Sequence, residues 1–262
     1  MLMTIFSDFL QRNTVKPAGV LPLVHTRPAR LLRHFSETNA IAPEPCDVFV
    51  GENLNYFFVG RPAYKYSSDD REAEYWELPC CFVFEFSTLQ NLKRVFPFDT
   101  GAFHNRLYPR YINDLKMDDF DALGTPDAVS RIIGAFFADI PSYFQLKPKP
   151  ESAFEQEFQL DVFDTEIRAL HRLAREKSST KYDDRRFSIE MQDTDSIDLS
   201  TKKPIAVIAP NQYYSNQAFR DHVTNVWGAT PLGYSTYRLS VTAAYYAIYQ
   251  NVEELFRRRG LL

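Results

Sequence analysis

Cysteine is scarce in this sequence, and long apolar runs are absent. Its 262 residues include three cysteines, Cys46, Cys80 and Cys81, an odd number of which two are adjacent. This arrangement predicts no disulfide framework and lacks the Cys and His spacing of a structural zinc site. The N-terminal segment has no basic start and no long apolar stretch, so we expect no secretory signal peptide. No run is long enough to cross a bilayer, and we therefore expect a cytoplasmic protein that does not contact a membrane.

The chain also lacks the short motifs that mark several common enzyme classes. It contains no phosphate-binding Walker loop, no Gly-x-Gly-x-x-Gly fingerprint, no Gly-x-Ser-x-Gly elbow and no His-Glu-x-x-His pair. These absences argue against P-loop hydrolysis, Rossmann-type redox chemistry and the common serine hydrolases, and we expect no bound metal. The net charge is −4 with acidic and basic residues mixed, which argues against a surface devoted to nucleic acid but allows a local basic groove.

Aromatic residues are abundant, and they indicate how the core is built. Phe and Tyr number 22 and 15, and aromatics make up 15% of the chain within a hydrophobic fraction of 45%. The hydrophobic fraction is ordinary for a globular chain with a real core. We therefore expect a core of packed rings, with some rings left over for a ligand surface.

The order of apolar runs and helical patterns predicts the fold class. Strands are expected at residues 19–25, 47–50, 54–59, 80–86, 185–192 and 204–209. Helices are expected at residues 29–35, 127–137, 152–158, 163–177, 216–225 and 240–259, and an aromatic-rich loop at 95–104. Because these elements do not alternate regularly, the pattern favours an α+β fold over a doubly wound sheet. We expect one domain over 1–262, with a helical segment in 1–18 and a C-terminal helix in 236–262.

Two early features are candidates for ligand binding. His25, followed by Thr26, ends the first apolar run, where a histidine can hydrogen-bond a ligand across the sheet; the alternative is a satisfied structural histidine. Tyr56 lies on the strand at 54–59, and Tyr64 and Tyr66 follow it. Such rings can sandwich a flat heterocycle, although in so aromatic a chain they can equally be core residues.

A late carboxylate is the third candidate. Glu190 lies in the alternating segment 185–192, where Phe187 and Ile189 should share one face while Ser188 and Glu190 share the other. Such a glutamate usually faces solvent. In a cleft, its carboxylate can hold a ribose hydroxyl and stabilise an oxocarbenium-like centre while a glycosidic bond breaks.

The loop at 95–104 supplies further polar candidates. Asp99, His104 and Arg106 lie in or just after it, flanked by aromatic rings, and functional side chains concentrate on such loops. We expect them to shape a substrate pocket, the alternative being a well-packed loop. Three other histidines, His34, His171 and His222, lie in helical patterns and are expected to be structural.

Taken together, the three candidates resemble the His–Tyr–Glu triad of ADP-ribosyltransferases of the diphtheria-toxin and poly(ADP-ribose)-polymerase types. The resemblance rests on these positions: His25-Thr26, Asn55-Tyr56 with Tyr64 or Tyr66, and the segment 188–192 around Glu190. Arg185, upstream of Glu190, is similar to the lead-in to the catalytic strand in several bacterial toxin-like members. Pro28, which follows His25 closely, matches no feature of the family.

The resemblance implies a single α+β domain with a split, mostly antiparallel sheet flanked by helices. It implies that His25, with Thr26 and Arg27, binds the adenosine-side ribose of NAD. Tyr56, with Tyr64 or Tyr66 as the second ring, would stack on the nicotinamide.

In the same family, the glutamate at the position of Glu190 bonds the nicotinamide ribose and stabilises the cation. Asp99, His104, Arg106 and Arg185 would then contact the substrate that accepts ADP-ribose. The expected function is NAD-dependent transfer of ADP-ribose to a protein, DNA or RNA, or NAD hydrolysis. The expected setting is a bacterial toxin or an anti-phage defence effector, with an antitoxin or other partner protein.

Two other functions stay open on the sequence alone. One is a non-catalytic interaction protein that uses its aromatic surface. The other is a nucleic-acid-processing enzyme, in which arginines would contact phosphates. The arginines concerned are Arg27, Arg30, Arg33, Arg185 and Arg186.

Overall fold

The computed structural model describes residues 3–12, 14–63, 70–176 and 187–262, and the chain forms two compact units. The first unit comprises Met1–Leu21, Cys46–Gly51 and Leu92–Gln192. The second unit comprises Pro22–Pro45, Glu52–Asn91 and Asp193–Leu262. The single domain expected over 1–262 stays a prediction.

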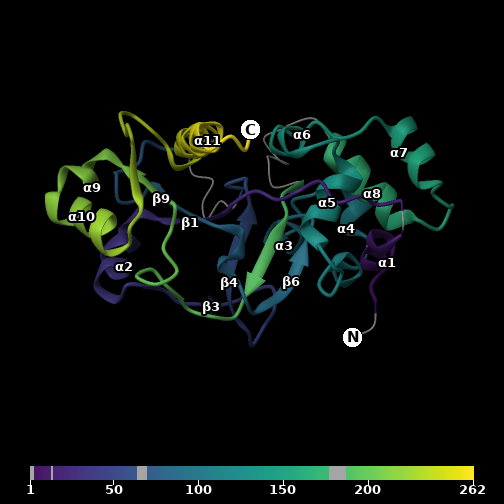
Figure 1. Cartoon of the computed structure of the whole chain (residues 1–262), viewed down its shortest axis with the longest axis horizontal. Coiled ribbons are helices and arrows are strands. Elements are labelled where there is room, and N and C mark those ends of the chain that lie inside the picture. The colour runs from purple at the N-terminus through teal and green to yellow at the C-terminus, as the bar shows by residue number, and fades with distance from the viewer. Residues whose placement is uncertain (1–2, 13, 64–69, 177–186) are drawn as a thin grey trace. The chain divides into compact units, whose positions relative to one another are not determined.

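The first unit is mainly helical (Figure 1). Its helices are α1 (Ile5–Gln11), α3 (Thr100–His104), α4 (Arg110–Asn113), η3 (Met117–Phe120), α5 (Ala128–Phe136), α6 (Ile140–Phe144), α7 (Glu151–Phe158) and α8 (Thr165–Arg175). Two neighbouring strands, β6 (Leu92–Phe96) and β7 (Glu190–Asp193), accompany them, and β7 belongs to this unit up to Gln192.

Packed aromatic rings form the core of this unit, as the composition predicts. Phe9 of α1 lies 6.2 Å from Phe136 of α5 and 5.1 Å from Phe158 of α7, measured between ring centroids. Phe154 and Phe187 also contact Phe136. Edge-to-face and offset ring pairs contribute about 0.5–1.5 kcal/mol each beyond their buried area, so this cluster ties α1 to the helices that follow it.

The second unit is built on a mostly antiparallel sheet. Its strands are β1 (Leu23–Pro28), β3 (Glu44–Pro45), β4 (Asn53–Val59), β5 (Pro79–Phe84), β9 (Ala206–Pro210) and β10 (Thr230–Tyr234). They run in the order β10-β9-β5-β1-β4, with β3 against β4, and the β9–β10 pair is parallel. A separate pair joins β2 (Ala40–Ile41) to β8 (Ile197–Asp198).

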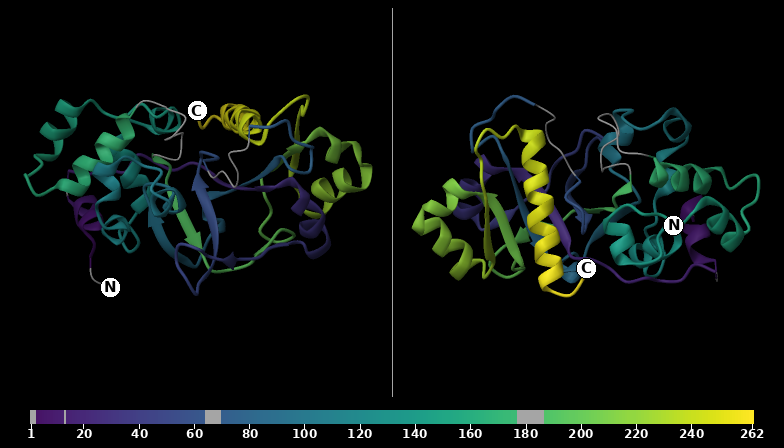
Figure 2. Two further views of the ribbon diagram at one scale, coloured as in Figure 1. Left: turned by 180° about the vertical axis from the view of Figure 1, so that it is seen from behind. Right: turned by 90° about the horizontal axis from the view of Figure 1, so that it is seen from above.

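Helices complete the second unit. They are η1 (Ala29–Leu31), α2 (Leu32–Thr38), η2 (Phe86–Thr88), α9 (Asn211–Ser215), α10 (Gln217–Asp221), the π-helix η5 (His222–Val226) and α11 (Val241–Arg258). The long helix α11 begins at Ser240, whose side chain accepts a hydrogen bond from the Ala243 amide. It packs against β5 and β10 and is the yellow helix of Figure 2. Its buried side chains include Ile248, Val252 and Phe256 at helical spacing.

Several expectations are confirmed by these elements. The α+β class and the mostly antiparallel sheet are confirmed, as are the helices around α5, α7, α8 and α11. Cys80 and Cys81 are buried on β5, and all three cysteines are free. None of the helices within the described ranges is long and apolar enough to cross a membrane.

Other expectations are wrong in instructive ways. Residues 47–50 form a turn rather than a strand, and the loop expected at 95–104 contains the end of β6 and all of α3. Strand β1 does not end before Thr26 but runs through Pro28, which pairs with Pro79 in register. Proline is tolerated there because it is the terminal residue of the strand.

The alternation expected at 185–192 is also overturned. From 187 onward every residue of this segment is buried, so Glu190 does not lie on a solvent face. A strand covered on both faces hides its polar side chains as well as its apolar ones. Residues before 187 in this segment lie outside the described ranges.

Candidate functional site

His25 is a buried, neutral histidine with one unsatisfied nitrogen. Its Nδ1 lies 2.8 Å from the backbone oxygen of Tyr56 on the neighbouring strand β4. A carbonyl only accepts, so Nδ1 carries the proton and Nε2 keeps its lone pair. Burial, with the charge of Arg27 as a smaller cause, lowers the pKa of His25 to about 3. Nε2 is buried, and none of the described residues supplies a hydrogen bond to it.

Arg27 presents a second unsatisfied group on the same strand. It lies two residues from His25, so the two side chains point to the same face of β1. The Arg27 guanidinium pairs with Glu44, but its Nε is buried without a hydrogen-bond partner in the described part of the chain. Together, His25 and Arg27 offer an acceptor and a donor side by side, each of which costs free energy while it stays unpaired.

The residues beside this pair have structural roles in the second unit. Thr26 is buried and hydrogen-bonds with the Cys81 thiol of β5. The Asn55 side chain donates to the backbone oxygens of Ile41 and Asp195, at 3.2 and 2.9 Å. Tyr56 is half-buried, and because the His25 ring contacts Phe57, strand alternation places the Tyr56 ring on the other face of β4.

Glu190 is the centre of a polar cluster in the first unit. Its exposure is 1%, and its carboxylate accepts three hydrogen bonds. Thr100 donates through its backbone amide at 3.0 Å and through its hydroxyl at 2.7 Å. Gln192, two residues along β7 on the same face, donates from Nε2 at 2.8 Å.

A second carboxylate, Asp99, lies next to this cluster. Its side chain caps α3 by accepting from the Ala102 amide at 2.9 Å, which explains why the helix begins at Thr100. Burial, and then the negative charge of Asp99, raise the pKa of Glu190 to about 8. At neutral pH the Asp99–Glu190 pair therefore prefers to carry a single negative charge.

Arg94 orients the amide that faces Glu190. Its guanidinium lies 3.8 Å from the centre of the Phe49 ring and donates to the Gln192 Oε1 at 3.1 Å. Because the amide oxygen accepts from Arg94, the amide nitrogen of Gln192 is the atom that faces Glu190. The result is a chain of contacts from β6 through β7 to the first turn of α3.

Comparisons of the chain with protein-family models, with curated proteins and with solved structures found no match. The chemistry of the chain's own residues is therefore the basis for a functional proposal.

The remaining predicted residues lie as follows. His104 and Arg106 are exposed at the end of α3, where Arg106 lies 3.9 Å from Asp114. Tyr64, Tyr66 and Arg185 fall outside the described residues. The structure brings Asp99 together with Glu190 in the first unit, and His25 together with the backbone of Tyr56 in the second. Whether His25 and Tyr56 meet Glu190 stays a prediction.

Sequence reasoning missed three residues of the Glu190 cluster. Gln192 could have been found, because strand alternation places it on the same face as Glu190. Thr100 and the capping role of Asp99 were hidden by the expectation of a loop, although Asp-Thr before small residues is a typical helix start. Arg94 carried no local signal, since only the pairing of β6 with β7 brings it to Gln192.

Two other chemistries find little support. In the described ranges, no group of three His, Cys, Asp or Glu side chains could hold a metal ion. Of the arginines considered for phosphate contacts, Arg27 pairs with Glu44 and Arg33 with Glu37. The ion pair occupies the Nε of Arg33, which disfavours a phosphate contact there, whereas the ion pair of Arg27 leaves its Nε unpaired in the described part of the chain.

Proposed function

We propose that this protein binds NAD, cleaves its nicotinamide–ribose bond and transfers the ADP-ribose to a macromolecule. The observation that carries the proposal is the buried, unpaired Nε2 of His25, which the Tyr56 carbonyl holds as a hydrogen-bond acceptor. A ribose hydroxyl can donate a hydrogen bond to this Nε2. The unpaired Nε of Arg27 on the same strand face suits an oxygen of the adjacent pyrophosphate.

The unpaired Nε2 of His25 and Nε of Arg27 are informative because each destabilises the folded protein. An unpaired buried donor or acceptor destabilises a fold by about 1–3 kcal/mol. A ligand that pairs both groups recovers that free energy on binding. The acceptor must also remain neutral, and the low pKa of His25 keeps it so over the physiological pH range.

The Asp99–Glu190 pair suits the bond-breaking step. The nicotinamide ring of NAD carries a positive charge, which favours the ionised form of Glu190. When the C1′–N bond breaks, its electron pair leaves with neutral nicotinamide, and the ribose becomes an oxocarbenium-like cation. A carboxylate stabilises that cation, and the same group can accept the proton that the incoming nucleophile loses.

The activity is tested by incubating the purified protein with NAD and measuring nicotinamide release, with and without cell lysate. Transfer is followed with NAD labelled in its adenine. We expect release, and label in a macromolecular fraction. Absence of nicotinamide under both conditions would overturn the proposal.

Matched variants test the residues. We expect Glu190→Gln to abolish release and His25→Phe to weaken NAD binding. Glu254→Gln and His34→Phe, at exposed positions, should behave as the unaltered protein. If Glu190→Gln retained full activity, the assignment of the carboxylate would fail even if NAD were cleaved.

A second candidate is an interaction protein, and one observation favours it. Val162 and Phe163, between α7 and α8, are 79% and 86% exposed. Adjacent apolar side chains held in solvent are typical of contact surfaces. Under this alternative NAD would not bind, and a Val162→Ser, Phe163→Ser double variant would lose a partner.

A further inference from the structure

A pocket in the first unit lies between helices α4, α7 and α8. Its volume is about 240 Å³. Its lining includes Tyr111, Glu151, Glu155, Arg168, His171 and Arg172. Sites for drug-sized ligands span roughly 300–1,000 Å³, so this one fits a smaller molecule. None of the residues proposed to act on NAD contributes to it.

His171 lines this pocket and carries a hydrogen-bond acceptor. The residue is 3% exposed, and its ring stacks on Phe154 with centroids 4.0 Å apart and an interplanar angle of 8°. Its Nε2 lies 2.8 Å from the Lys149 backbone oxygen and must therefore carry the proton. Burial lowers the pKa of His171, so the ring stays neutral. Nδ1 keeps its lone pair, and no hydrogen bond to it is made by the described residues.

One wall of the pocket is acidic. Glu151 and Glu155 are four residues apart on α7 and share a face. Glu151 pairs with Arg175 at 2.6 Å, and Glu155 pairs with Arg168.

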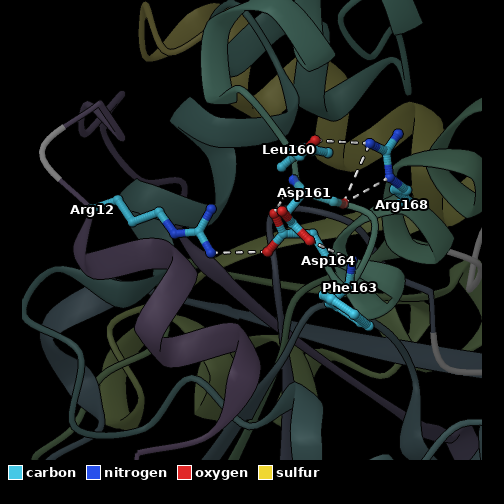
Figure 3. A network of polar contacts seen from close by, with 6 residues as sticks. All are labelled: Arg12, Leu160, Asp161, Phe163, Asp164 and Arg168. Atoms are coloured by element: carbon cyan, nitrogen blue, oxygen red, sulfur yellow. Dashed lines mark hydrogen bonds and ion pairs between the residues drawn. The ribbon is translucent and has the colours of Figure 1, made fainter.

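Arg168 is fully engaged in holding this wall. Figure 3 shows its guanidinium directed at the backbone oxygens of Leu160, at 3.0 Å, and Asp161. The same loop is braced by Asp164, which bonds to Arg12 at 2.9 Å and to the Asp161 amide at 2.7 Å (Figure 3). The carboxylates of α7 are therefore fixed in place and keep lone pairs for a ligand.

Arg172 of α8 adds a cation to the lining of the pocket. The Arg172 guanidinium lies 4.1 Å from the centre of the Tyr111 ring, and the Tyr111 hydroxyl donates to Glu176 at 3.0 Å. Arg172 itself is 3.9 Å from Glu176, beyond hydrogen-bond distance, and its side chain is 65% exposed. Stacking fixes the plane of the guanidinium and leaves its N–H edge for a carboxylate.

We propose that this pocket binds a small zwitterion, an α-amino acid. The ligand's ammonium group meets the Nδ1 of His171 and the carboxylates of Glu151 and Glu155. Its carboxylate meets the N–H edge of Arg172.

The test is calorimetric titration of the full-length protein with each standard L-amino acid at millimolar concentration. We expect saturable binding of at least one. For that amino acid, the methyl ester and the N-acetyl derivative should each bind about tenfold more weakly or not at all, since each removes one charge-assisted contact. The proposal is overturned if no amino acid binds saturably, or if both derivatives bind as well as the parent.

Variants locate the binding. Arg172→Leu should weaken the affinity about tenfold or more, whereas Arg110→Leu, at a 92% exposed arginine with its own i,i+4 partner, should not change it. His171→Phe keeps the stack on Phe154 and removes the acceptor, and it should also weaken binding. Unchanged affinity in Arg172→Leu would refute the site even if His171→Phe failed to fold. Loss of NAD cleavage has no bearing on this result, because the pocket contains neither His25 nor Glu190.

Discussion

The buried carboxylate of Glu190 should make the stability of the protein fall as the pH rises. Its pKa in the folded protein is raised from an ordinary value of 4.5 to about 8. A raised pKa means that the folded state binds the proton more tightly than the unfolded state. The stabilisation is therefore complete below pH 4.5 and is lost as the pH rises through 8. At about 1.4 kcal/mol for each pKa unit, the loss is at most ~5 kcal/mol.

Glu190→Gln removes this titration. The curve of its unfolding free energy against pH should therefore cross the curve of the unaltered protein. At low pH, the single acceptor oxygen of the new amide can pair with the Thr100 N–H or with the Gln192 Nε2 but not with both, so the variant should be less stable by about 1–3 kcal/mol. Towards pH 8, the unaltered protein must bury a charge beside Asp99 and the variant need not. The variant should then become the more stable of the two.

Urea unfolding at a series of pH values between 4.5 and 8.5 measures this difference. Asp99→Asn is the matched control, because asparagine also caps helices well while it removes the neighbouring charge. Because removing the Asp99 charge lowers the pKa of Glu190 in the folded protein, the fall in stability should become smaller and end at a lower pH. Curves for Glu190→Gln and the unaltered protein that run parallel across the whole range would refute the reasoning.

Three further outcomes are expected. Because the pKa of His25 is lowered to about 3, its stabilisation is present above pH 6.5 and is lost as the pH falls towards 3; His25→Phe should flatten this acid limb in urea titrations. In Gly134→Ala, the new Cβ would lie 1.8 Å from the Lys16 backbone oxygen, so thermal unfolding should show a loss of about 1–3 kcal/mol. Asn39 has a φ of 52° and accepts from the Trp227 indole at 2.9 Å; Asn39→Ala should cost about 1–3 kcal/mol, and unchanged thermal stability would contradict this account.

The amino-acid sequence alone was sufficient to predict the class of fold and many of its helices and strands. The helical spacing of apolar residues located α8 and α11, because the face of each helix that packs against the core is apolar. The apolar runs that became β5 and β9 were equally clear, because their side chains are buried on both faces. The excess of Phe predicted a core of packed rings, which both units have.

Local patterns failed where a segment's structure depends on distant partners. The stretch 95–104 carried proline, glycine and aromatic residues typical of a loop, yet β6 extends into it and Asp99 starts α3. Residues 47–50 resembled a strand but have no strand partner in the described structure. A strand requires a neighbour to pair with, and the sequence of one segment does not name that neighbour.

For the candidate site, the sequence determined which groups are present, and the tertiary structure decided their chemical state. His25, Arg27 and Glu190 could be selected from residue type and position alone. That Glu190 is buried, hydrogen-bonded to Thr100 90 residues away and next to Asp99 depends on the packing of β7 against the start of α3. The same holds for His25, whose tautomer is set by the Tyr56 carbonyl on an adjacent strand. Burial and hydrogen bonding set a pKa, and both are properties of contacts between segments far apart in the chain.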